Sequence, residues 1–429
     1  MAVAETLQLS VVSLGGGELA SIDVGAEATV YDSKVLLAKQ LGVTPLRQQL
    51  IHGSARLQCR DRLADVGVTD GATLTLVRSA SVSFVLTTSR DETARLWSVD
   101  NGGLSGDTKR INGECLQTFA GHTGAVLCGG FAPDGGSVMT ASEDGSVRIW
   151  SIGTGVCIRC FPGPRSCLRR AWFSPDGLAV LAIYDGRSPR LWSVETGACL
   201  QTFGSHKVSL NSACFSPDGA RVLTASNDSL ARLWATHKGT FLHAFRGHED
   251  CVASAEFSPD GSLVITASYD CTARVWSVAT FECLYELGGH KNWVRQATFS
   301  PDGRFVLIAS DDGSAELWSV EATRMVRSHR VVRYLQEITA ACFAPEGGTV
   351  LTAWADGVVR LWGEESGEVL CDILSERGVA SATLSPADGL ALTICGSDGS
   401  AKLWNTRTAE CVLTLAGHCK EVTSAVFSP

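Results

Sequence analysis

The chain has 429 residues, enough for two or three ordinary domains or for one small domain joined to a repeat array. Its 45% hydrophobic and 19% charged residues are typical of a globular protein rather than a disordered one. The net charge of −9 argues against nucleic acid as the main partner, because proteins that bind a phosphate backbone usually carry a basic face.

The start of the chain, MAVAETLQLSVV, lacks the basic region and long apolar core of a secretory signal. No segment reaches the roughly 18 apolar residues of a membrane span. We therefore expect a cytoplasmic or nuclear protein with no membrane partner, in which the 16 cysteines are reduced thiols.

Residues 7–78 predict a small α+β domain. The strand patterns LQLSVV and LASIDV flank Gly15-Gly16-Gly17, which is typical of a hairpin loop. A helix is predicted next, with Thr29 as its cap and Gly42 as its stop. The segment LRQQLIHGSARLQCRDRLADVGVTDGATLTLV follows and ends in another strand pattern. This order of elements resembles the ubiquitin-like β-grasp family.

The resemblance implies a recognition surface on this domain. Ubiquitin's apolar patch maps onto Ile51 and Val77, with Leu14 as a third member, although all three could be ordinary core or surface positions. The family's conjugating Gly-Gly end is not found here, because Val77 runs on through Arg78-Ser79-Ala80 into the next domain. The domain is therefore expected to be recognised non-covalently, by ubiquitin-recognising machinery.

Residues 83–429 contain eight similar segments, each closed by a tryptophan; the first two tryptophans are 53 residues apart, and the later ones 42 to 44. The closing residues are Trp97, Trp150, Trp192, Trp234, Trp276, Trp318, Trp362 and Trp404. Each segment has four short strand patterns, with a Pro-Asp-Gly turn after the first and alternation such as ARLW in the third. Antiparallel four-stranded units repeated in this way predict the blades of a β-propeller.

These segments resemble the WD-repeat family, whose blades hold a hydrogen-bonded tetrad of His, Ser or Thr, Asp and Trp. The resemblance assigns it to His122, Ser142, Asp144 and Trp150; to His206, Ser226, Asp228 and Trp234; to His248, Ser268, Asp270 and Trp276; to His290, Ser310, Asp312 and Trp318; and to His418, Ser89, Asp91 and Trp97. Recurrence at one repeat phase favours a structural role over a catalytic one, because buried Asp and His need hydrogen bonds. No catalytic residue is predicted.

Three segments depart from this pattern. Pro164, Tyr334 and Ser375 stand at the histidine position. Gly186 replaces an Asp, and Trp354 replaces a Ser. We expect these blades to be looser than the others, or adapted to a partner.

The first tryptophan-bearing segment lacks a first strand, and the last segment, GHCKEVTSAVFSP, supplies a first strand with nothing after it. Pairing the two would close the ring and remove exposed sheet edges. The sequence therefore favours eight blades, with seven as the alternative. The motif normally continues Asp-Gly after Pro429, so a fragment of a longer protein is also an interpretation of this end.

No cofactor or metal is predicted. Cys157 and Cys160 form a CxxC, but no second pair stands at zinc spacing. Five cysteines share one phase of the fourth strand and are interpreted as packing thiols. They are Cys115, Cys157, Cys199, Cys283 and Cys411.

Trp293 and Tyr269 are candidate partner-binding residues. Trp293 follows Gly289-His290 at a phase where other segments have small or polar residues, and Tyr269 lies in the neighbouring Asp turn. Exposed aromatics at one face of a propeller would form a binding hot spot. The alternative is that Trp293 packs against a neighbouring loop.

The resemblances together imply a non-catalytic protein-interaction scaffold or adaptor, with other proteins or peptides as partners. One alternative is a propeller enzyme, which would need carboxylates converging on the axis. Another is a histone or nucleic-acid reader, for which Arg169, Arg170 and Arg295 would form a basic ring.

A third alternative is a substrate receptor of a cullin-type ubiquitin ligase. The segment LTICGSDGSAKLWNTR resembles the box by which some WD-repeat proteins dock the ligase adaptor. Gly396, Asp398, Trp404 and Arg407 match that box, whereas Asn405 replaces its acidic residue. Arg407 would offer a forked donor to the adaptor.

Overall fold

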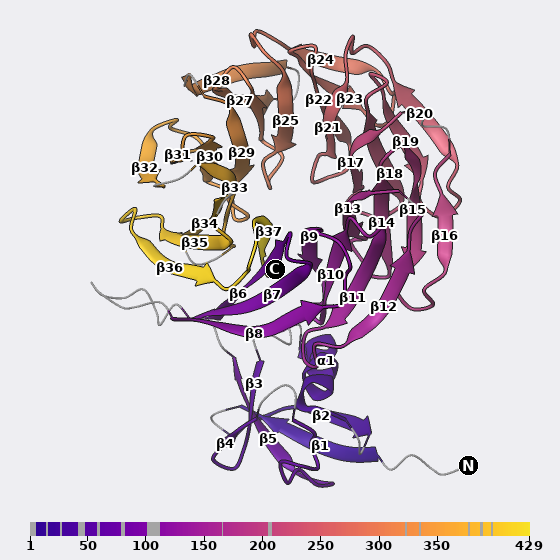
Figure 1. The fold of residues 1–429 in the computed structure, drawn as a ribbon, viewed down its shortest axis with the longest axis vertical. Coiled ribbons are helices and arrows are strands. Elements are labelled where there is room, and N and C mark those ends of the chain that lie inside the picture. The colour runs from indigo at the N-terminus through magenta and orange to yellow at the C-terminus, as the bar shows by residue number, and fades with distance from the viewer. Residues whose placement is uncertain are drawn as a thin grey trace.

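The computed structural model describes most of the chain (Figure 1). The described residues are 6–13, 16–25, 28–41, 48–57, 61–78, 82–100, 112–164, 166–204, 208–321, 324–333, 336–375, 378–386, 389–395 and 398–429. Leu14, His206, Tyr334 and Gly396, and the side chain of Val77, lie outside this description. Strands dominate throughout, and no helix among the described residues is long and apolar enough to cross a membrane.

The first domain is a five-stranded sheet with one helix beside it. Its elements are β1 (Thr6–Val12), β2 (Glu18–Gly25), α1 (Val30–Leu41), β3 (Gln48–His52), β4 (Ala55–Arg56) and β5 (Thr73–Arg78). The sheet order is β2-β1-β5-β3-β4, with β1 and β5 parallel, as the ubiquitin-like resemblance implies. Thr29 caps the helix, because its Oγ1 accepts the backbone N–H of Asp32 at 3.2 Å. Leu9, Leu37 and Leu50 meet in the core between helix and sheet.

The rest of the chain forms a ring of four-stranded antiparallel sheets, which we number as blades 1 to 8 in chain order (Figure 1). Blade 1 is β6 (Val82–Ser89), β7 (Thr93–Asp100) and β8 (Asn112–Ala120), with β37 (Val422–Phe427). Blade 2 is β9 (Val126–Phe131), β10 (Ser137–Ser142), β11 (Ser146–Ser151) and β12 (Cys157–Pro162). Blade 3 is β13 (Leu168–Phe173), β14 (Ala179–Tyr184), β15 (Arg187–Ser193) and β16 (Cys199–Thr202). Blade 4 is β17 (Leu210–Phe215), β18 (Arg221–Ser226), β19 (Ala231–Ala235) and β20 (Phe241–Phe245).

Blade 5 is β21 (Val252–Phe257), β22 (Leu263–Ser268), β23 (Ala273–Ser277) and β24 (Cys283–Leu287). Blade 6 is β25 (Val294–Phe299), β26 (Phe305–Ser310), β27 (Ser314–Glu321) and β28 (Arg324–Arg333). Blade 7 is β29 (Ile338–Phe343), β30 (Thr349–Trp354), β31 (Val358–Gly363) and β32 (Val369–Leu374). Blade 8 is β33 (Val379–Leu384), β34 (Leu390–Cys395), β35 (Ser400–Asn405) and β36 (Cys411–Ala416). The described part of the chain thus contains eight four-stranded sheets, which favours eight blades over seven.

Blade 1 joins the two ends of the repeat array. The C-terminal strand β37 pairs antiparallel with β6, and Val422 lies opposite Ser89. The predicted closure is therefore confirmed at the level of strand pairing. Because of this pairing, β6 is an inner strand of its sheet and does not leave an exposed edge at the start of the repeat array.

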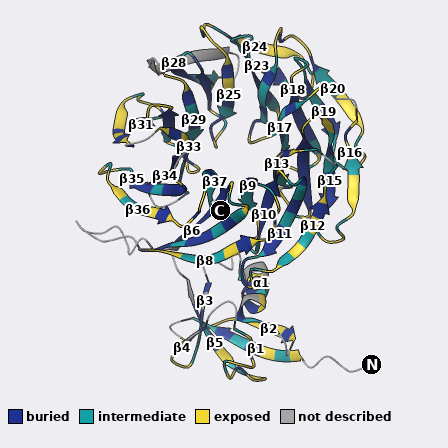
Figure 2. Ribbon diagram, viewed as in Figure 1, coloured by how far each residue is buried: buried dark blue, intermediate teal, exposed yellow. Residues whose placement is uncertain are grey.

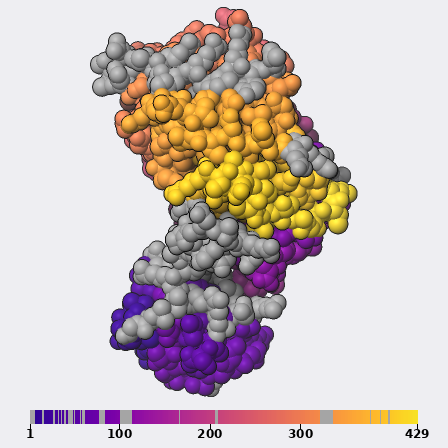
Figure 3. Space-filling model, turned by 90° about the vertical axis from the view of Figure 1, so that its left-hand side faces the viewer, coloured from indigo at the N-terminus to yellow at the C-terminus, as the bar shows by residue number. Residues whose placement is uncertain are grey.

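Burial is greatest in the second strand of each blade, whereas the first strand, which faces the centre of the ring, is largely half-buried (Figure 2). The second strand of each blade is almost wholly buried, and the third alternates between buried and half-buried residues. The fourth strands are largely exposed, and Figure 3 shows those of blades 7 and 8 at the rim of the ring, in orange and yellow. Apolar clusters fill the spaces between neighbouring blades, so each blade depends on its neighbours for a core.

A β-bulge recurs at every closing tryptophan. In blade 2, Ile149 pairs with Arg159 but Trp150 pairs with Cys157, so Ile158 is an extra, exposed residue. The cysteines that share one phase of the fourth strand all lie opposite a closing tryptophan. They are half-buried or exposed, which is less burial than their interpretation as packing thiols requires.

Candidate partner-binding site

A hydrogen-bonded chain of side chains holds the closing tryptophan in three blades. In blade 5, Trp276 Nε1 donates to Thr266 Oγ1 at 2.9 Å, and this hydroxyl lies 2.8 Å from His248 Nε2. The other ring nitrogen of His248 lies 2.7 Å from Asp270 Oδ2. Blades 1 and 2 repeat this chain with His418, Thr87, Asp91 and Trp97, and with His122, Thr140, Asp144 and Trp150.

The hydroxyl in this chain differs from the sequence assignment. The resemblance assigned Ser268, but the structure uses Thr266, two residues earlier on the same face of the strand. Thr266 is within reach of the indole, whereas Ser268 lies at the end of β22, beside the turn. Ser268 Oγ accepts the N–H of Asp270 and donates to the carbonyl of Asp250.

The same correction applies to the other assigned serines. Ser142, Ser89, Ser226 and Ser310 each accept the backbone N–H of the Asp two residues later, at 3.1 to 3.4 Å. The assigned serines therefore position the turn aspartates.

Blade 4 keeps the bond from its closing tryptophan, since Trp234 Nε1 donates to Thr224 Oγ1 at 3.0 Å. In blade 4, Asp228 forms an ion pair with Arg232 at 2.8 Å. In blade 6, Ile308 stands where Thr266 stands in blade 5, so this position offers no hydroxyl to His290 or Trp318. His290 Nδ1 lies 3.1 Å from Ser314 Oγ instead and 3.8 Å from Asp312 Oδ1.

The His122–Asp144 pair of blade 2 is ionised on the Asp side. Burial alone would raise the pKa of Asp144, but hydrogen bonds from Ser146 and His122 lower it to about 2. Burial lowers the pKa of His122 in turn. At neutral pH these residues are a neutral imidazole held by a carboxylate, and both are buried within the blade.

Two of the irregular blades are filled by aromatic residues. In blade 3, the fully buried Tyr184 lies against Gly163, where a side chain would collide with its ring. Burial raises the pKa of Tyr184 to about 12. In blade 7, Trp354 is also fully buried, and its Nε1 donates to the carbonyl of Gly313 in blade 6 at 3.3 Å. The interiors of these two blades are therefore filled by aromatic rings, and the expectation that the irregular blades are looser or adapted to a partner stays a prediction.

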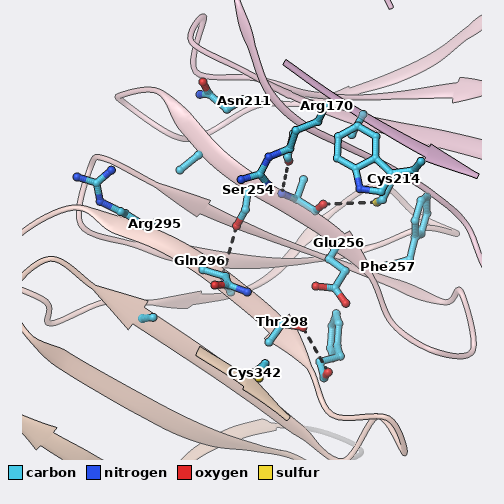
Figure 4. A pocket seen from close by; sticks show the side chains of 18 of the residues that line it. Arg170, Asn211, Cys214, Ser254, Glu256, Phe257, Arg295, Gln296, Thr298 and Cys342 are labelled. Atoms are coloured by element: carbon cyan, nitrogen blue, oxygen red, sulfur yellow. Dashed lines mark hydrogen bonds between the residues drawn. The ribbon is translucent and has the colours of Figure 1, made fainter. Parts of the chain in front are cut away.

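Residues from the first strands of blades 2 to 7 line a central cavity of about 1180 Å³ (Figure 4). Arg169, Arg170 and Arg295 all line it, together with Trp172. Two of these arginines already have acidic neighbours: Arg169 lies 3.2 Å from an oxygen of Asp185, and Arg295 Nε donates to Asp311 at 2.5 Å. The basic ring suggested by the sequence is therefore largely neutralised.

Glu256 is the one carboxylate among the described residues that line this cavity. Burial raises its pKa to about 7, although a hydrogen bond from Thr298 opposes the shift. Figure 4 shows Glu256 and Thr298 on neighbouring first strands, both directed into the cavity. The carboxylates converging on the axis that a propeller enzyme was expected to need are thus represented, among the described lining residues, by Glu256.

The two aromatic candidates lie together beside the cavity. The rings of Tyr269 and Trp293 stack with centroids 4.5 Å apart and 16° between their planes. The guanidinium of Arg295 lies 5.9 Å from the centre of the indole. Trp293 packs against neighbours, as the alternative expected, yet 44% of it stays exposed. The result is a pre-ordered aromatic surface that spans blades 5 and 6.

The remaining candidates are placed less fully. Ile51 is half-buried on β3, and it is the one member of the expected ubiquitin-like patch whose side chain is described. Arg407 is exposed, and its backbone N–H donates to Asn405 Oδ1 at 2.8 Å. Among the described residues, no group of three or more His, Cys, Asp or Glu is placed to hold a metal ion.

Comparison with known proteins shows the family. The family model described as IFT122 first beta-propeller matches residues 209–429, just over half of the chain, and the WD domain, G-beta repeat model matches residues 113–151. The chain belongs to the WD-repeat β-propeller family. The ubiquitin family model matches residues 11–81, so this WD-repeat protein carries a ubiquitin-like domain at its N-terminus.

Individual relatives are similar over short stretches. They include a Notchless protein homolog of Arabidopsis thaliana (50% identity over 9% of this chain and 8% of the relative), eukaryotic translation initiation factor 3 subunit I of Danio rerio (42%, over 14% and 18%) and a guanine nucleotide-binding protein subunit beta of Nicotiana tabacum (38%, over 18% and 18%). The chain thus covers less than a fifth of the length of each of these relatives. The computationally designed Ika8 protein has the same fold, with a TM-score of 0.64 and 23% identity over 72% of this chain and 92% of that one.

Proposed function

We propose that this WD-repeat protein is a non-catalytic scaffold that holds a partner protein at the mouth of its central cavity. The observation that carries the proposal is the exposed stack of Tyr269, Trp293 and Arg295 beside the cavity. Tyrosine, tryptophan and arginine are the residues most enriched in binding hot spots. Because the rings are already stacked, little side-chain entropy remains to be lost on binding.

The charge around the stack supports a protein partner rather than a nucleic acid. Asp311 and Asp185 neutralise Arg295 and Arg169, and Glu256 adds a carboxylate within the cavity. A phosphate backbone would need an excess of cations at this mouth. A peptide with both apolar and polar side chains is the better match.

The His–Asp pairs favour a scaffold over an enzyme. In blades 1, 2 and 5 the imidazole is hydrogen-bonded on both sides by residues of its own blade. A general base must instead reach a proton of the substrate. These groups are thus engaged in holding the closing tryptophans.

We also propose that the ubiquitin-like domain couples the scaffold to ubiquitin-recognising proteins. The support is the domain's family match and the half-buried Ile51 on β3. Ile51→Ala should weaken binding of a ubiquitin-recognising protein to the full chain, while Trp293→Ala should leave that binding unchanged. Equal binding by both variants and the wild type would refute the coupling.

A second candidate, the ligase substrate receptor, is favoured by one observation. Arg407 is exposed, and the turn that presents it is fixed by the Asn405 side chain. Co-purification of the ligase adaptor with wild type and with Arg407→Ala decides this candidate. Its prediction is a marked loss of adaptor in the variant, and equal recovery would refute it.

The test of the main proposal is a double variant, Tyr269→Ala with Trp293→Ala, in the full chain. Partners recovered by the wild type should be lost from the double variant, as measured by quantitative mass spectrometry of purified complexes. The matched control is Phe241→Ala, which removes an exposed aromatic from the outer strand β20 and should retain the partners. Full recovery by the double variant would place the partner site elsewhere.

A further inference from the structure

One blade carries a carboxylate at a repeat position that is otherwise apolar or threonine. The position lies two residues after each closing tryptophan. In chain order it holds Val99, Ile152, Val194, Thr236, Val278, Val320, Glu364 and Thr406. Glu364, in blade 7, is only 4% exposed. A buried carboxylate is costly unless it is paired, so its presence here needs a reason.

One oxygen of Glu364 has a structural role. In blade 5 the turn between the first two strands is capped by Asp260 Oδ1, which accepts the N–H of Ser262 at 3.0 Å. Blade 7 has Glu346 at the position of that Asp. The turn N–H there, of Gly348, donates instead to Glu364 Oε2 at 2.6 Å. Glu364 therefore supplies the acceptor that the usual aspartate supplies elsewhere.

The other oxygen of Glu364 has no such role. Within the described part of the chain, no hydrogen-bond partner lies near Glu364 Oε1. Glu364 lines a pocket of about 380 Å³ between blades 6 and 7. The other lining residues are Pro301, Asp302, Arg304, Phe305, Glu346, Gly347, Gly348 and Glu365. We call this pocket the acidic notch, because it combines four carboxylates with one arginine.

The arginine of the acidic notch stays at its rim. Arg304 is exposed, and its guanidinium contacts Glu365 at 3.1 Å and Asp302 at 3.8 Å. Burial raises the pKa of Glu364, and the charges of Asp302 and Glu365 raise it further. A cation at the base of the notch would relieve both the desolvation and the repulsion.

We propose that the acidic notch binds an arginine side chain of a partner protein, with Glu364 Oε1 as the buried acceptor. A guanidinium has five N–H donors in one plane, so it can donate to Oε1 and keep further donors for other carboxylates that line the notch. A divalent metal ion is a poorer occupant, because no group of three or more potential ligands is placed to hold one among the described residues.

The acidic notch lies on the opposite face of the ring from the aromatic stack. Trp293 directly precedes strand β25, and Pro301 of the notch follows the end of that strand at Phe299. A strand of six residues is about 20 Å long. The acidic notch therefore gives the propeller a second binding face, independent of the aromatic stack and with a different chemistry.

The experiment is a titration of the ¹⁵N-labelled full chain with acetyl-Gly-Arg-Gly-amide, followed through the amide signals of Gly347 and Gly348. We expect saturable shifts with this peptide and none with the citrulline analogue, which has the same shape without the charge. Glu364→Gln keeps an acceptor for the Gly348 N–H and should fold, but should bind the peptide about tenfold more weakly, as loss of one charge-assisted hydrogen bond brings.

Two further variants keep the test decisive. Glu346→Gln changes an exposed residue of the notch and should also weaken binding, even if Glu364→Gln does not fold. Glu368→Gln removes the same charge from an exposed residue of blade 7 outside the notch and should bind like the wild type. The proposal would be overturned if the arginine peptide caused no saturable shifts, or if the citrulline peptide bound equally well. It would also be overturned if Glu364→Gln and Glu346→Gln both bound the arginine peptide with the affinity of the wild type. Tighter binding of the matching lysine peptide, acetyl-Gly-Lys-Gly-amide, would overturn the assignment to arginine.

Discussion

Blades 5 and 3 each bury their closing tryptophan, but they surround it with different side chains. In blade 5, Trp276 is 2% exposed and ends a hydrogen-bonded chain through Thr266 and His248 to Asp270. In blade 3, Trp192 is 5% exposed, although Pro164, Ala182 and Gly186 stand where His, Thr and Asp would be. Nearly equal burial shows that the polar chain is not needed to close a blade.

The replacement in blade 3 is an aromatic ring. Tyr184 occupies the position of Ser268 in blade 5 and is fully buried. Trp354 occupies the same position in blade 7, and it is fully buried too. Large buried rings contribute much of the apolar area in a protein core. A departure from the motif is therefore not by itself a sign of a loose blade or a binding site.

The largest expected effect comes from removing residues 417–429. This deletion removes β37 and His418 together, so blade 1 loses its first strand and its hydrogen-bonded chain. We expect loss of cooperative thermal unfolding, measured by circular dichroism. Lys420→Ala, an exposed change in the same segment, is the control and should melt like the wild type. An unchanged melting curve for the deletion would contradict the closure of the ring through its termini.

Tyr184→Ala should destabilise the protein more than the loss of a single polar group from a hydrogen-bonded chain. It removes a fully buried ring and leaves a cavity between blades 2 and 3, so we expect a loss of about 3–5 kcal/mol in the free energy of unfolding. Tyr184→Phe keeps the ring and should lose much less. Denaturant unfolding of both variants measures this, and similar small losses would show that the ring is dispensable.

Asp270→Ala should lower the free energy of unfolding by about 1–3 kcal/mol, because the donors that the Asp270 carboxylate accepts from are left unpaired. The pKa of Asp270 is lowered in the folded protein, chiefly by hydrogen bonds from His248 and Thr272 that outweigh burial. Because this pKa is lower in the folded than in the unfolded protein, the Asp270 carboxylate stabilises the fold at pH values above the unfolded pKa of 3.8. This contribution is lost as the pH falls from 3.8 through the lower, folded-state pKa.

The wild type should therefore lose stability on acidification below about pH 4, because the carboxylates whose pKa is lowered in the folded protein become protonated. Asp144 and Asp91, whose pKa values are about 2, act in the same direction. Asp270→Ala should lose less stability than the wild type over this range, measured by urea unfolding at each pH. Parallel pH profiles for the two proteins would mean that the Asp270 carboxylate contributes no such effect.

The comparison of blades also shows what the sequence could predict. Strand pattern, the Pro-Asp-Gly turns and the closing tryptophans are local features, so the blades and the pairing of β37 with β6 followed from them. The choice of Thr266 over Ser268 depends on cross-strand position, which residue spacing alone does not reveal. Thr266 and Ser268 lie on the same face of β22, and either residue fits the Ser-or-Thr position of the sequence motif.

The two proposed binding surfaces, the aromatic stack and the acidic notch, also could be predicted from the sequence only in part. Tyr269 and Trp293 could be singled out because each differs from its repeat counterparts, but their stacking depends on the packing of two blades. The acidic notch combines Asp302 of blade 6 with Glu364 of blade 7, which are far apart in sequence. Comparing the residue two positions after each closing tryptophan would have identified Glu364 as an exception.

The smallest expected effect on stability sharpens the comparison between buried and exposed aromatics. Trp293→Ala removes a stacked ring that is 44% exposed, so the pair with Tyr269, worth about 0.5–1.5 kcal/mol, is lost together with the contact to the Arg295 guanidinium. Tyr184→Ala should cost several times more, since its ring is fully buried. Urea unfolding of the two variants side by side gives the ratio. If Trp293→Ala destabilises the protein as much as Tyr184→Ala, then Trp293 is a structural residue of blade 6, and its place in the partner-binding surface is refuted. A small loss of stability with a large loss of partner would instead assign the buried aromatic to the fold and the exposed one to recognition.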